Sequence, residues 1–194
     1  MTRSGIYRGT MTPSPARIAQ AQDAAAVAAL AARTFPLACP PSLPREHVQT
    51  FIAQNLGEAE FAGHIAEPGH RVLVVDGAPG PDGAARPVGY ALVLHGDFDE
   101  GPESLRGAPS TYLSKLYVDP DHHGSGVART LLDAAVLGAA GEPLWLGVNA
   151  DNARAKRFYA KSGFVVAGTR TFTVGGTTFV DDVLVLAASA ARGA

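Results

Sequence analysis

Two glycines, Gly124 and Gly126, lie between a strand pattern and a helix pattern, in a place that suits phosphate binding. Residues 112–118 are mainly aliphatic and aromatic and are followed by an Asp-Pro pair, which predicts a strand and its end. From Val127 onward, apolar residues recur at helical spacing. The start of a helix presents unpaired N–H groups and the positive end of the helix dipole. The pattern therefore predicts a turn whose backbone amides bind phosphate.

Two familiar phosphate motifs do not fit this turn. A P-loop requires a lysine directly after its last glycine, and Val127 stands there. A dinucleotide-binding fingerprint requires a third glycine, and Arg129 occupies that place. The turn also lies past the midpoint of the 194 residues, so too few strand–helix units follow it to complete a doubly wound sheet.

The run from His123 to Ala128 instead resembles the pyrophosphate loop of the GNAT superfamily of N-acetyltransferases. That loop reads Gln/Arg-x-x-Gly-x-Gly/Ala, and Gly126 and Ala128 match it, whereas His123 replaces the usual Gln or Arg. A second block is similar to the family's other coenzyme A motif, Asn-x-x-Ala-x-x-Phe-Tyr-x-Lys-x-Gly-Phe. Its matching residues are Asn152, Ala155, Phe158, Tyr159, Lys161, Gly163 and Phe164. The resemblance covers residues 112 to about 180.

The resemblance implies an α/β (α+β) fold with a single GNAT-type domain. Its central sheet would be mixed and mostly antiparallel, flanked by helices, with strands four and five splayed apart. We expect this domain to span residues 15–190 and a flexible N-terminal tail to span residues 1–14. The order of the expected strands and helices agrees with such a sheet and disagrees with a purely parallel one.

Several expected elements build this order. We predict strands at 16–19, 71–76, 87–95, 112–118 and 144–149, and a closing hairpin of 165–173 and 177–186 that turns at Gly175 and Gly176. Helices are predicted at 21–35, 45–55 and 152–161, from Val127 onward, and for one or two turns within 58–65. Residues 36–44 contain four prolines and are predicted to form a loop.

The same resemblance implies the residues that bind acetyl-coenzyme A as co-substrate. In the family, the pantetheine arm inserts between strands four and five, and backbone amides of the glycine turn bind the pyrophosphate. Carried onto this sequence, the coenzyme contacts are Leu116, Tyr117, Val118, His123, Gly124, Ser125, Gly126, Val127, Ala128, Arg129, Asn152 and Tyr159. Asn152 has two open interpretations, a coenzyme contact or a cap for its own helix.

Tyr159 is the candidate catalytic residue. A phenol has a pKa near 10, comparable to that of an alkyl thiol, so it can return a proton to the departing sulfur. A general base is harder to assign, because Tyr112 stands where some family members carry a glutamate. Lys115 would need burial to lower its pKa. Asp181 and Asp182 are alternatives, but such a pair in a last strand is typically solvent-facing or structural.

The acceptor is predicted from weaker signals. The acidic residues Asp97, Asp99, Glu100 and Glu103 follow the third expected strand and would either attract a cationic amine or form an ordinary solvated loop. The sequence also partly resembles bacterial spermidine/spermine-type acetyltransferases. We therefore expect acetyl transfer to a primary amine, and first to a small cationic amine such as a polyamine. The alternatives are acetylation of a protein N-terminus or lysine, and a non-catalytic regulator that binds acyl-coenzyme A.

Composition narrows the remaining classes. A net charge of −2 without a basic block argues against nucleic-acid binding, and no apolar run approaches the roughly 18 residues that span a membrane. The single cysteine, Cys39, forms no internal disulfide and suits a reducing, cytoplasmic location. The six histidines lack metal-ligand spacing, so no metal is expected. Composition leaves both a monomer and a homodimer open.

Overall fold

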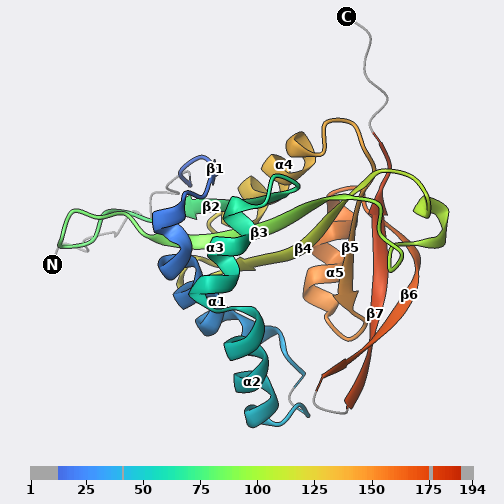
Figure 1. Ribbon diagram of the computed structural model, residues 1–194, viewed down its shortest axis with the longest axis horizontal. Helices are drawn as coiled ribbons and strands as arrows, with labels where there is room; N and C mark the ends of the chain where they lie inside the picture. The colour runs from blue at the N-terminus through green and yellow to red at the C-terminus, as the bar shows by residue number, and fades with distance from the viewer. Residues whose placement is uncertain (1–12, 41, 175–176, 189–194) are drawn as a thin grey trace, which may run out of the picture.

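A seven-stranded sheet forms the centre of the computed structural model, which describes residues 13–40, 42–174 and 177–188 (Figure 1). The strands lie in the order β1-β2-β3-β4-β5-β7-β6, and only the β4–β5 pair is parallel. Their bounds are β1 Arg17–Ile18, β2 His70–Asp76, β3 Pro87–Gly96, β4 Ser110–Val118, β5 Leu144–Asn149, β6 Val165–Val174 and β7 Thr177–Leu186. The mixed, mostly antiparallel sheet is thus confirmed. Residues 1–12 of the expected tail and the turn at 175–176 lie outside the described residues.

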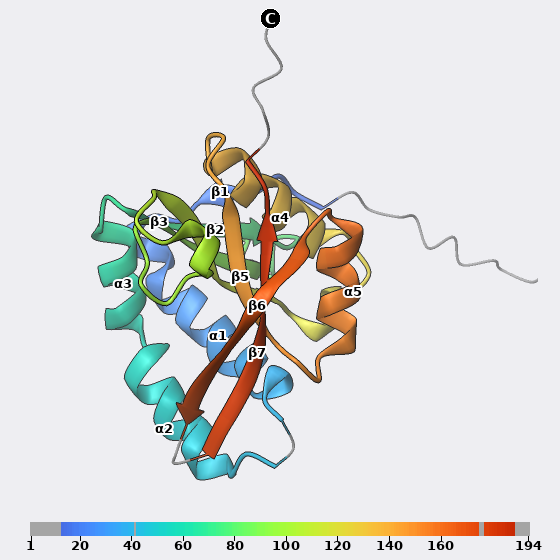
Figure 2. The ribbon, with the colours of Figure 1, turned by 90° about the vertical axis from the view of Figure 1, so that its right-hand side faces the viewer.

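Five helices cover the two faces of the sheet (Figure 2). Their bounds are α1 Ala24–Ala38, α2 Arg45–Asn55, α3 Glu58–Ala66, α4 Val127–Gly138 and α5 Ala153–Lys161. One buried cluster lies under α1 and α3 and contains Val27, Phe61 and Tyr90. The other lies under α4 and α5 and contains Leu131 and Leu146. The amphipathic spacing of each helix explains these two cores, because each apolar stripe packs on one sheet face.

The expected loop from residue 36 begins three residues too early. Helix α1 continues through Pro36 and ends at Ala38. A proline inside a helix removes one backbone donor, but at this position the loss is confined to the last turn. The Cys39 amide then donates to the Pro36 carbonyl oxygen at 3.4 Å and closes the helix.

The β4–β5 pair opens into a gap after a short paired stretch. Only Thr111 with Leu144 and Tyr112 with Trp145 are in register. Beyond them, β4 carries one extra residue, Ser114, opposite the step from Leu92 to Val93 in β3. Such a bulge bends a strand and increases its twist, so β4 turns away from β5. The expected splaying of strands four and five is confirmed.

Candidate active site

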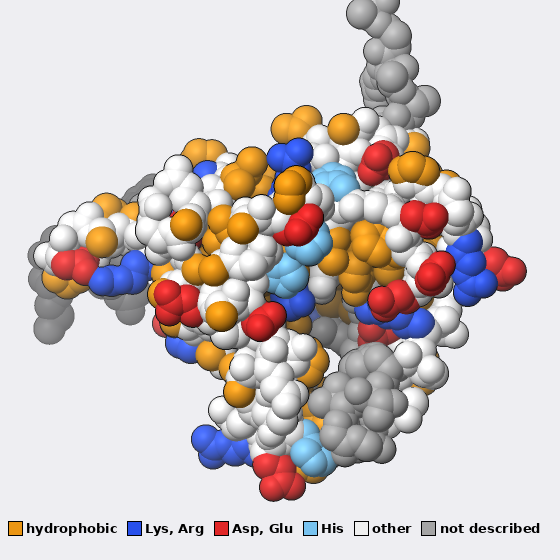
Figure 3. All heavy atoms as spheres, viewed as in Figure 1, with side chains coloured by type: hydrophobic (Ala, Val, Ile, Leu, Met, Phe, Trp, Pro, Cys, Tyr) orange, Lys and Arg blue, Asp and Glu red, His pale blue; other side chains and the backbone are white. Residues whose placement is uncertain are grey.

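A cavity of about 1120 Å³ occupies the gap between β4 and β5 and the space beside it. Its walls come from α1, the segment between α1 and α2, the β3–β4 loop, β4, β5, α5, β6 and β7. Figure 3 shows acidic and basic side chains gathered over the β3–β4 loop, at the rim of this face. The exposed residues Asp99, Glu100 and Glu103 of that loop line the cavity.

Seven of the predicted coenzyme contacts line the cavity, namely Leu116, Tyr117, Val118, His123, Ala128, Asn152 and Tyr159. The remaining five do not. Gly124, Ser125 and Gly126 form an exposed turn outside it. Val127 is buried in the core under α4, and the exposed Arg129 pairs with Asp133 at 2.7 Å. The turn therefore extends the site beyond the cavity, with backbone rather than side-chain groups.

The glycine turn has a backbone shape that glycine alone adopts without strain. Gly124 and Gly126 have φ angles of 80° and 93°, in the left-handed region. Gly126 precedes the first residue of α4, so the unpaired N–H groups of that helix begin at the turn. This arrangement has the geometry of an anion site at a helix start.

His123 connects the turn to the cavity. Its Nε2 lies 3.1 Å from the Val118 carbonyl oxygen and its Nδ1 lies 3.3 Å from Arg154 Nη1. Both contacts are satisfied when Nε2 donates and Nδ1 accepts, which is the neutral form of the ring. The contact brings the Arg154 guanidinium, which also lines the cavity, close to the turn. Sequence reasoning missed Arg154, because the motif leaves that helical position unspecified.

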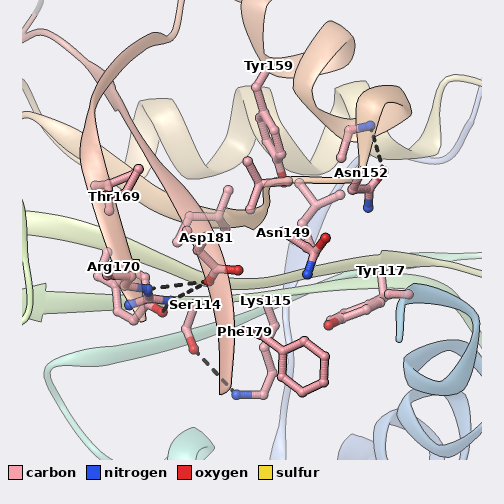
Figure 4. Close-up of a pocket in the computed structure, with 18 of the residues that line it drawn as sticks. Ser114, Lys115, Tyr117, Asn149, Asn152, Tyr159, Thr169, Arg170, Phe179 and Asp181 are labelled. Carbon is pink, nitrogen blue, oxygen red and sulfur yellow. Dashed lines mark hydrogen bonds and ion pairs between the residues drawn. The ribbon is translucent and has the colours of Figure 1, made fainter. Parts of the chain in front are cut away.

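Tyr159 reaches the cavity from α5. Its ring contacts Phe158 and Phe164 edge-on, and the residue is only 8% exposed. Burial raises the pKa of its phenol above the ordinary value, so the hydroxyl keeps its proton at neutral pH. Figure 4 shows the side chain pointing from the helix toward the gap between the strands. A protonated phenol in this position can serve as a proton donor.

Asn152 caps α5. Its Oδ1 accepts a hydrogen bond from the Ala155 amide at 3.0 Å, so the capping interpretation is confirmed. Because the residue also lines the cavity, its side-chain amide nitrogen remains available there (Figure 4). The cap and a coenzyme contact are therefore compatible.

Asp181 corrects an expectation, because it faces the cavity rather than solvent. It is 7% exposed and lines the cavity wall, whereas Asp182 pairs with Lys156 of α5 at 2.5 Å. Neighbouring residues of a strand point to opposite faces, so only one of the two can face the acceptor side. Burial raises the pKa of the Asp181 carboxyl more than nearby Arg170 lowers it.

Arg170 holds Asp181 from the neighbouring strand. Its Nε and Nη2 each lie 3.4 Å from Asp181 Oδ2, and Nη2 donates to the Tyr112 hydroxyl oxygen at 2.9 Å. The guanidinium lies over the rings of Tyr112 and Trp145, which stack at 4.0 Å between centroids. Burial disfavours its charge, but Tyr112 and Asp181 outweigh this and raise the pKa of Arg170.

Gly147 provides the space for this guanidinium. A Cβ atom at Gly147 would lie 2.5 Å from Arg170 Nη2 and 2.8 Å from Cζ and Nε. Sequence reasoning missed Arg170 and Gly147, since their contact depends on strand register. A lone arginine among threonines and valines in an expected strand was the one available signal.

Lys115 is a partly buried cation on the same wall. Its ammonium donates to Ser114 Oγ at 3.4 Å and has no carboxylate partner among the residues that the structure describes. Burial lowers its pKa from the ordinary value. The wall on this side therefore combines one carboxylate with two cations, and the exposed loop adds further acidic groups.

The cavity extends from the side of the glycine turn, where His123 and Ala128 line it, into the gap between β4 and β5. Within the described ranges, no group of three or more His, Cys, Asp or Glu side chains could hold a metal ion. A search of the same ranges finds no helix that is long and apolar enough to cross a membrane.

Comparisons with known proteins agree with this geometry. Residues 27–164 match the sequence model of the Acetyltransferase (GNAT) family. An uncharacterized N-acetyltransferase of Mycobacterium tuberculosis is 44% identical over 166 residues, which cover 84% of this chain and 96% of that protein. A GCN5-related N-acetyltransferase from Rhodopseudomonas palustris has 26% identity and a TM-score of 0.64, and the match covers 92% of this chain and 99% of the other.

A further solved structure shares the fold. The PaiA N-acetyltransferase from Thermoplasma acidophilum, in complex with coenzyme A, has a TM-score of 0.60 at 16% identity, over 86% of this chain and 95% of that one. The chain belongs to the acetyltransferase (GNAT) family. Within that family it is an N-acetyltransferase.

Proposed function

We propose that this enzyme transfers the acetyl group of acetyl-coenzyme A to the primary amine of a small cationic molecule, with polyamines as the first class. The single observation that carries this proposal is the buried Asp181 carboxylate on the cavity wall. A carboxylate there offers an ammonium group a charged hydrogen-bond acceptor. The acidic β3–β4 loop at the rim supplies a field that attracts further positive charge.

The coenzyme would bind along β4 and at the start of α4. Backbone groups of Leu116, Tyr117 and Val118 border the gap, where β5 does not pair with them, and would bond the pantetheine arm. The backbone amides of Gly124, Gly126, Val127 and Ala128 would bind the pyrophosphate, with Arg154 beside them, whereas the His123 and Ser125 amides already donate within the turn. Among the side chains of this turn, Val127 and Arg129 contribute no contact in this proposal, because the first is buried and the second pairs with Asp133.

Tyr159 is the general acid in this proposal. The support is its position at the gap and the protonated state that burial maintains. Fixed backbone donors near the thioester carbonyl would stabilise the charge that develops on its oxygen, an effect worth about 3 kcal/mol per donor.

A small acceptor is favoured over a peptide by the walls on the acceptor side. Leu43 and Phe51 from the α1–α2 region, the β3–β4 loop and Phe179 of β7 all border the same cavity. A long peptide would need an open path between these three segments.

The exposed valines Val165 and Val166 lie on β6, an edge strand of the sheet, and support a homodimer. We further propose that the enzyme is cytoplasmic and that its GNAT domain spans residues 15–190.

Steady-state thiol release from acetyl-coenzyme A tests the acceptor class. Separate reactions would contain polyamines, amino acids, aminoglycosides, and peptides with free N-termini or lysines. We expect the highest kcat/KM with a polyamine. Faster release with a peptide would overturn the small-acceptor assignment, and no release with any amine, alongside measured coenzyme binding, would overturn the proposal as a whole.

A further inference from the structure

The cavity wall on the acceptor side contains one buried carboxylate, Asp181, and an arginine held against it from the next strand. We propose that Asp181 is the general base that removes the proton from the acceptor ammonium, and that Arg170 is the positioning residue that orients its carboxylate. This inference rests on the proposed function, since it assigns the base for the same reaction. Asp181 would thus supply the general base, which Tyr112 cannot supply at the place in β4 where some family members carry a glutamate.

The proton donor Tyr159 and the proposed base Asp181 lie on opposite faces of the sheet. Leu146, Val148 and Tyr159 belong to the core under α4 and α5. Asp181 pairs with Asn149 and Arg170 across the neighbouring strands, and directly opposed residues point to the same face. Arg170 in turn lies over Gly147 and Trp145. Asp181 therefore approaches from the face opposite α5, where Tyr117 packs beside Tyr90, and Figure 4 shows it between Tyr159 and Phe179.

Arg170 fixes the carboxylate through contacts that come from three strands. Both Nε and Nη2 contact one carboxylate oxygen, Oδ2. The Tyr112 hydroxyl accepts from Nη2, and the Tyr112–Trp145 stack lies under the guanidinium. No hydrogen bond to the second oxygen, Oδ1, is found within the described part of the chain, so this atom is available to an ammonium group.

The reaction balances with these groups. The Asp181 carboxylate takes one proton from the ammonium and becomes a carboxylic acid, which leaves a neutral amine. The amine nitrogen forms a bond to the acetyl carbonyl carbon, and the carbon–sulfur bond breaks. The departing sulfur takes the proton of the Tyr159 hydroxyl, and the amide nitrogen loses its remaining extra proton to solvent. Water then reprotonates the phenolate and deprotonates the carboxyl.

The charged and titratable groups around Asp181 determine the pH range in which it is an ionised carboxylate and can act as a base. Arg170 from β6 favours the carboxylate, and Lys115 from β4 adds a second positive charge on the wall. Adjacent Asp182 and burial disfavour it. Tyr112 and Tyr117 of β4 and Tyr159 of α5 also line the cavity. Its other titratable or charged lining residues are Cys39, Asp99, Glu100, Glu103, Arg106, His123 and Arg154. Removing Arg170 therefore raises the pKa of Asp181 further.

The test is the pH dependence of kcat/KM for Asp181→Asn, with Asp182→Asn as the matched control from the opposite face. Without its base, the enzyme must take the neutral amine from solution, and an alkyl amine has a pKa of about 10. We expect a loss of about 10³-fold at pH 7 that falls to about tenfold at pH 9. A fluorinated acceptor whose amine pKa is near 7 should recover most of the activity. Asp182→Asn should retain wild-type-like activity at pH 7, and its acidic limb should move slightly to lower pH, because the negative charge that raises the pKa of Asp181 is gone.

Arg170 is tested by its effect on the profile rather than on activity alone. Arg170→Met should move the acidic limb of kcat/KM to higher pH, and Arg170→Lys should restore it in part. A purely structural role would lower activity equally at every pH. Circular dichroism and coenzyme binding confirm that each variant folds, and Asp181→Glu provides a second variant that retains a carboxylate. Wild-type-like activity of Asp181→Asn at pH 7, or a loss that does not change with pH, would overturn the inference. A wild-type enzyme that acetylates no small amine would instead overturn the proposed function.

Discussion

Tyr159 and Asp181 approach the β4–β5 gap from opposite faces of the sheet (Figure 4). Tyr159 comes from α5 through the core under α4 and α5, and Asp181 comes from β7 on the side of α1 and α2. A thioester held in the gap would have a proton donor on one side and a proton acceptor on the other. The bulge at Ser114 creates this arrangement, because it separates β4 from β5.

Replacement of Tyr159 by phenylalanine tests the proton donor. The variant keeps the ring that packs on Phe158 and Phe164 and loses only the hydroxyl. We expect kcat to fall about 10²-fold or more, the usual range for a general acid. The dissociation constant for coenzyme A, measured by calorimetry, should remain within about twofold of wild type. Unchanged turnover would remove Tyr159 from the proton transfer.

Replacement of Gly124 by alanine tests the glycine turn. Gly124 has a φ of 80° and no heavy atom within 4 Å of an added Cβ, so the substitution acts through backbone strain alone. Left-handed conformations cost other residues about 1–2 kcal/mol. We expect a dissociation constant for coenzyme A about tenfold higher than in wild type. Gly141→Ala is the matched control, because Gly141 has a φ of 95° and equally open surroundings. An equal loss of coenzyme affinity in both variants would contradict a phosphate role for the turn.

Gly147 is predicted to be intolerant of a side chain. In Gly147→Ala the new Cβ displaces the Arg170 guanidinium from its place between Tyr112 and Asp181. Overpacking of this kind costs about 1–3 kcal/mol in the free energy of unfolding, which chemical denaturation would measure. Gly63→Ala in α3, where the added Cβ meets open space, should instead stabilise the protein by about 0.5–1 kcal/mol. A neutral Gly147→Ala variant would show that the guanidinium is free to move.

Lys115 is predicted to reduce stability at neutral pH. Its pKa is lowered in the folded protein, so the unfolded chain binds more protons between that pKa and 10.5. The free energy of unfolding therefore rises with pH across this window. Lys115→Met should be more stable than wild type at pH 7, with an advantage that shrinks toward pH 10.5. Exposed Lys161→Met serves as control. A constant difference at all pH values would contradict a buried charge.

Replacement of Lys115 also distinguishes two kinds of acceptor, a polyamine and an amine that carries a carboxylate. Its ammonium faces the cavity without a carboxylate partner in the described ranges. With a polyamine, Lys115→Met removes a like charge, and KM should fall by about 3- to 10-fold, equivalent to roughly 1 kcal/mol at an intermediate dielectric constant. An acceptor that carries a carboxylate would show the reverse, a higher KM in the variant. KM values for spermidine and for a diamino acid, measured side by side, provide the comparison.

The sequence was sufficient for the features that local spacing determines. The alternating and helical patterns predicted the strands and helices to within a few residues, and the cap formed by Asn152 was one of the two interpretations that the second coenzyme motif left open. It also identified Tyr159 as a residue at the gap, because the motif places it one helical turn after Ala155. The prediction of a loop at residues 36–38 was wrong, because the loss of a single backbone donor at Pro36 did not end α1.

The acceptor side could not be predicted, because it depends on register between strands that are distant in the sequence. Alternation along β7 shows that Asp181 and Asp182 face opposite ways, but not which of them faces the cavity. The answer requires the pairing of Asp181 with Arg170 and Asn149. The role of Gly147 likewise appears only when the Arg170 side chain crosses β7 to reach it.

One competition experiment tests directly whether the enzyme acetylates a small cationic amine. Wild-type enzyme would be incubated with acetyl-coenzyme A and an equimolar mixture of spermidine, a neutral aminosugar, a lysine peptide and a peptide with a free N-terminus. Mass spectrometry would then quantify each acetylated product. We expect acetylspermidine to exceed every other product by at least about tenfold, and Asp181→Asn to lose this product at pH 7. Preferential acetylation of a peptide, or equal labelling of neutral and cationic amines, would show that the acceptor is not a small cationic amine.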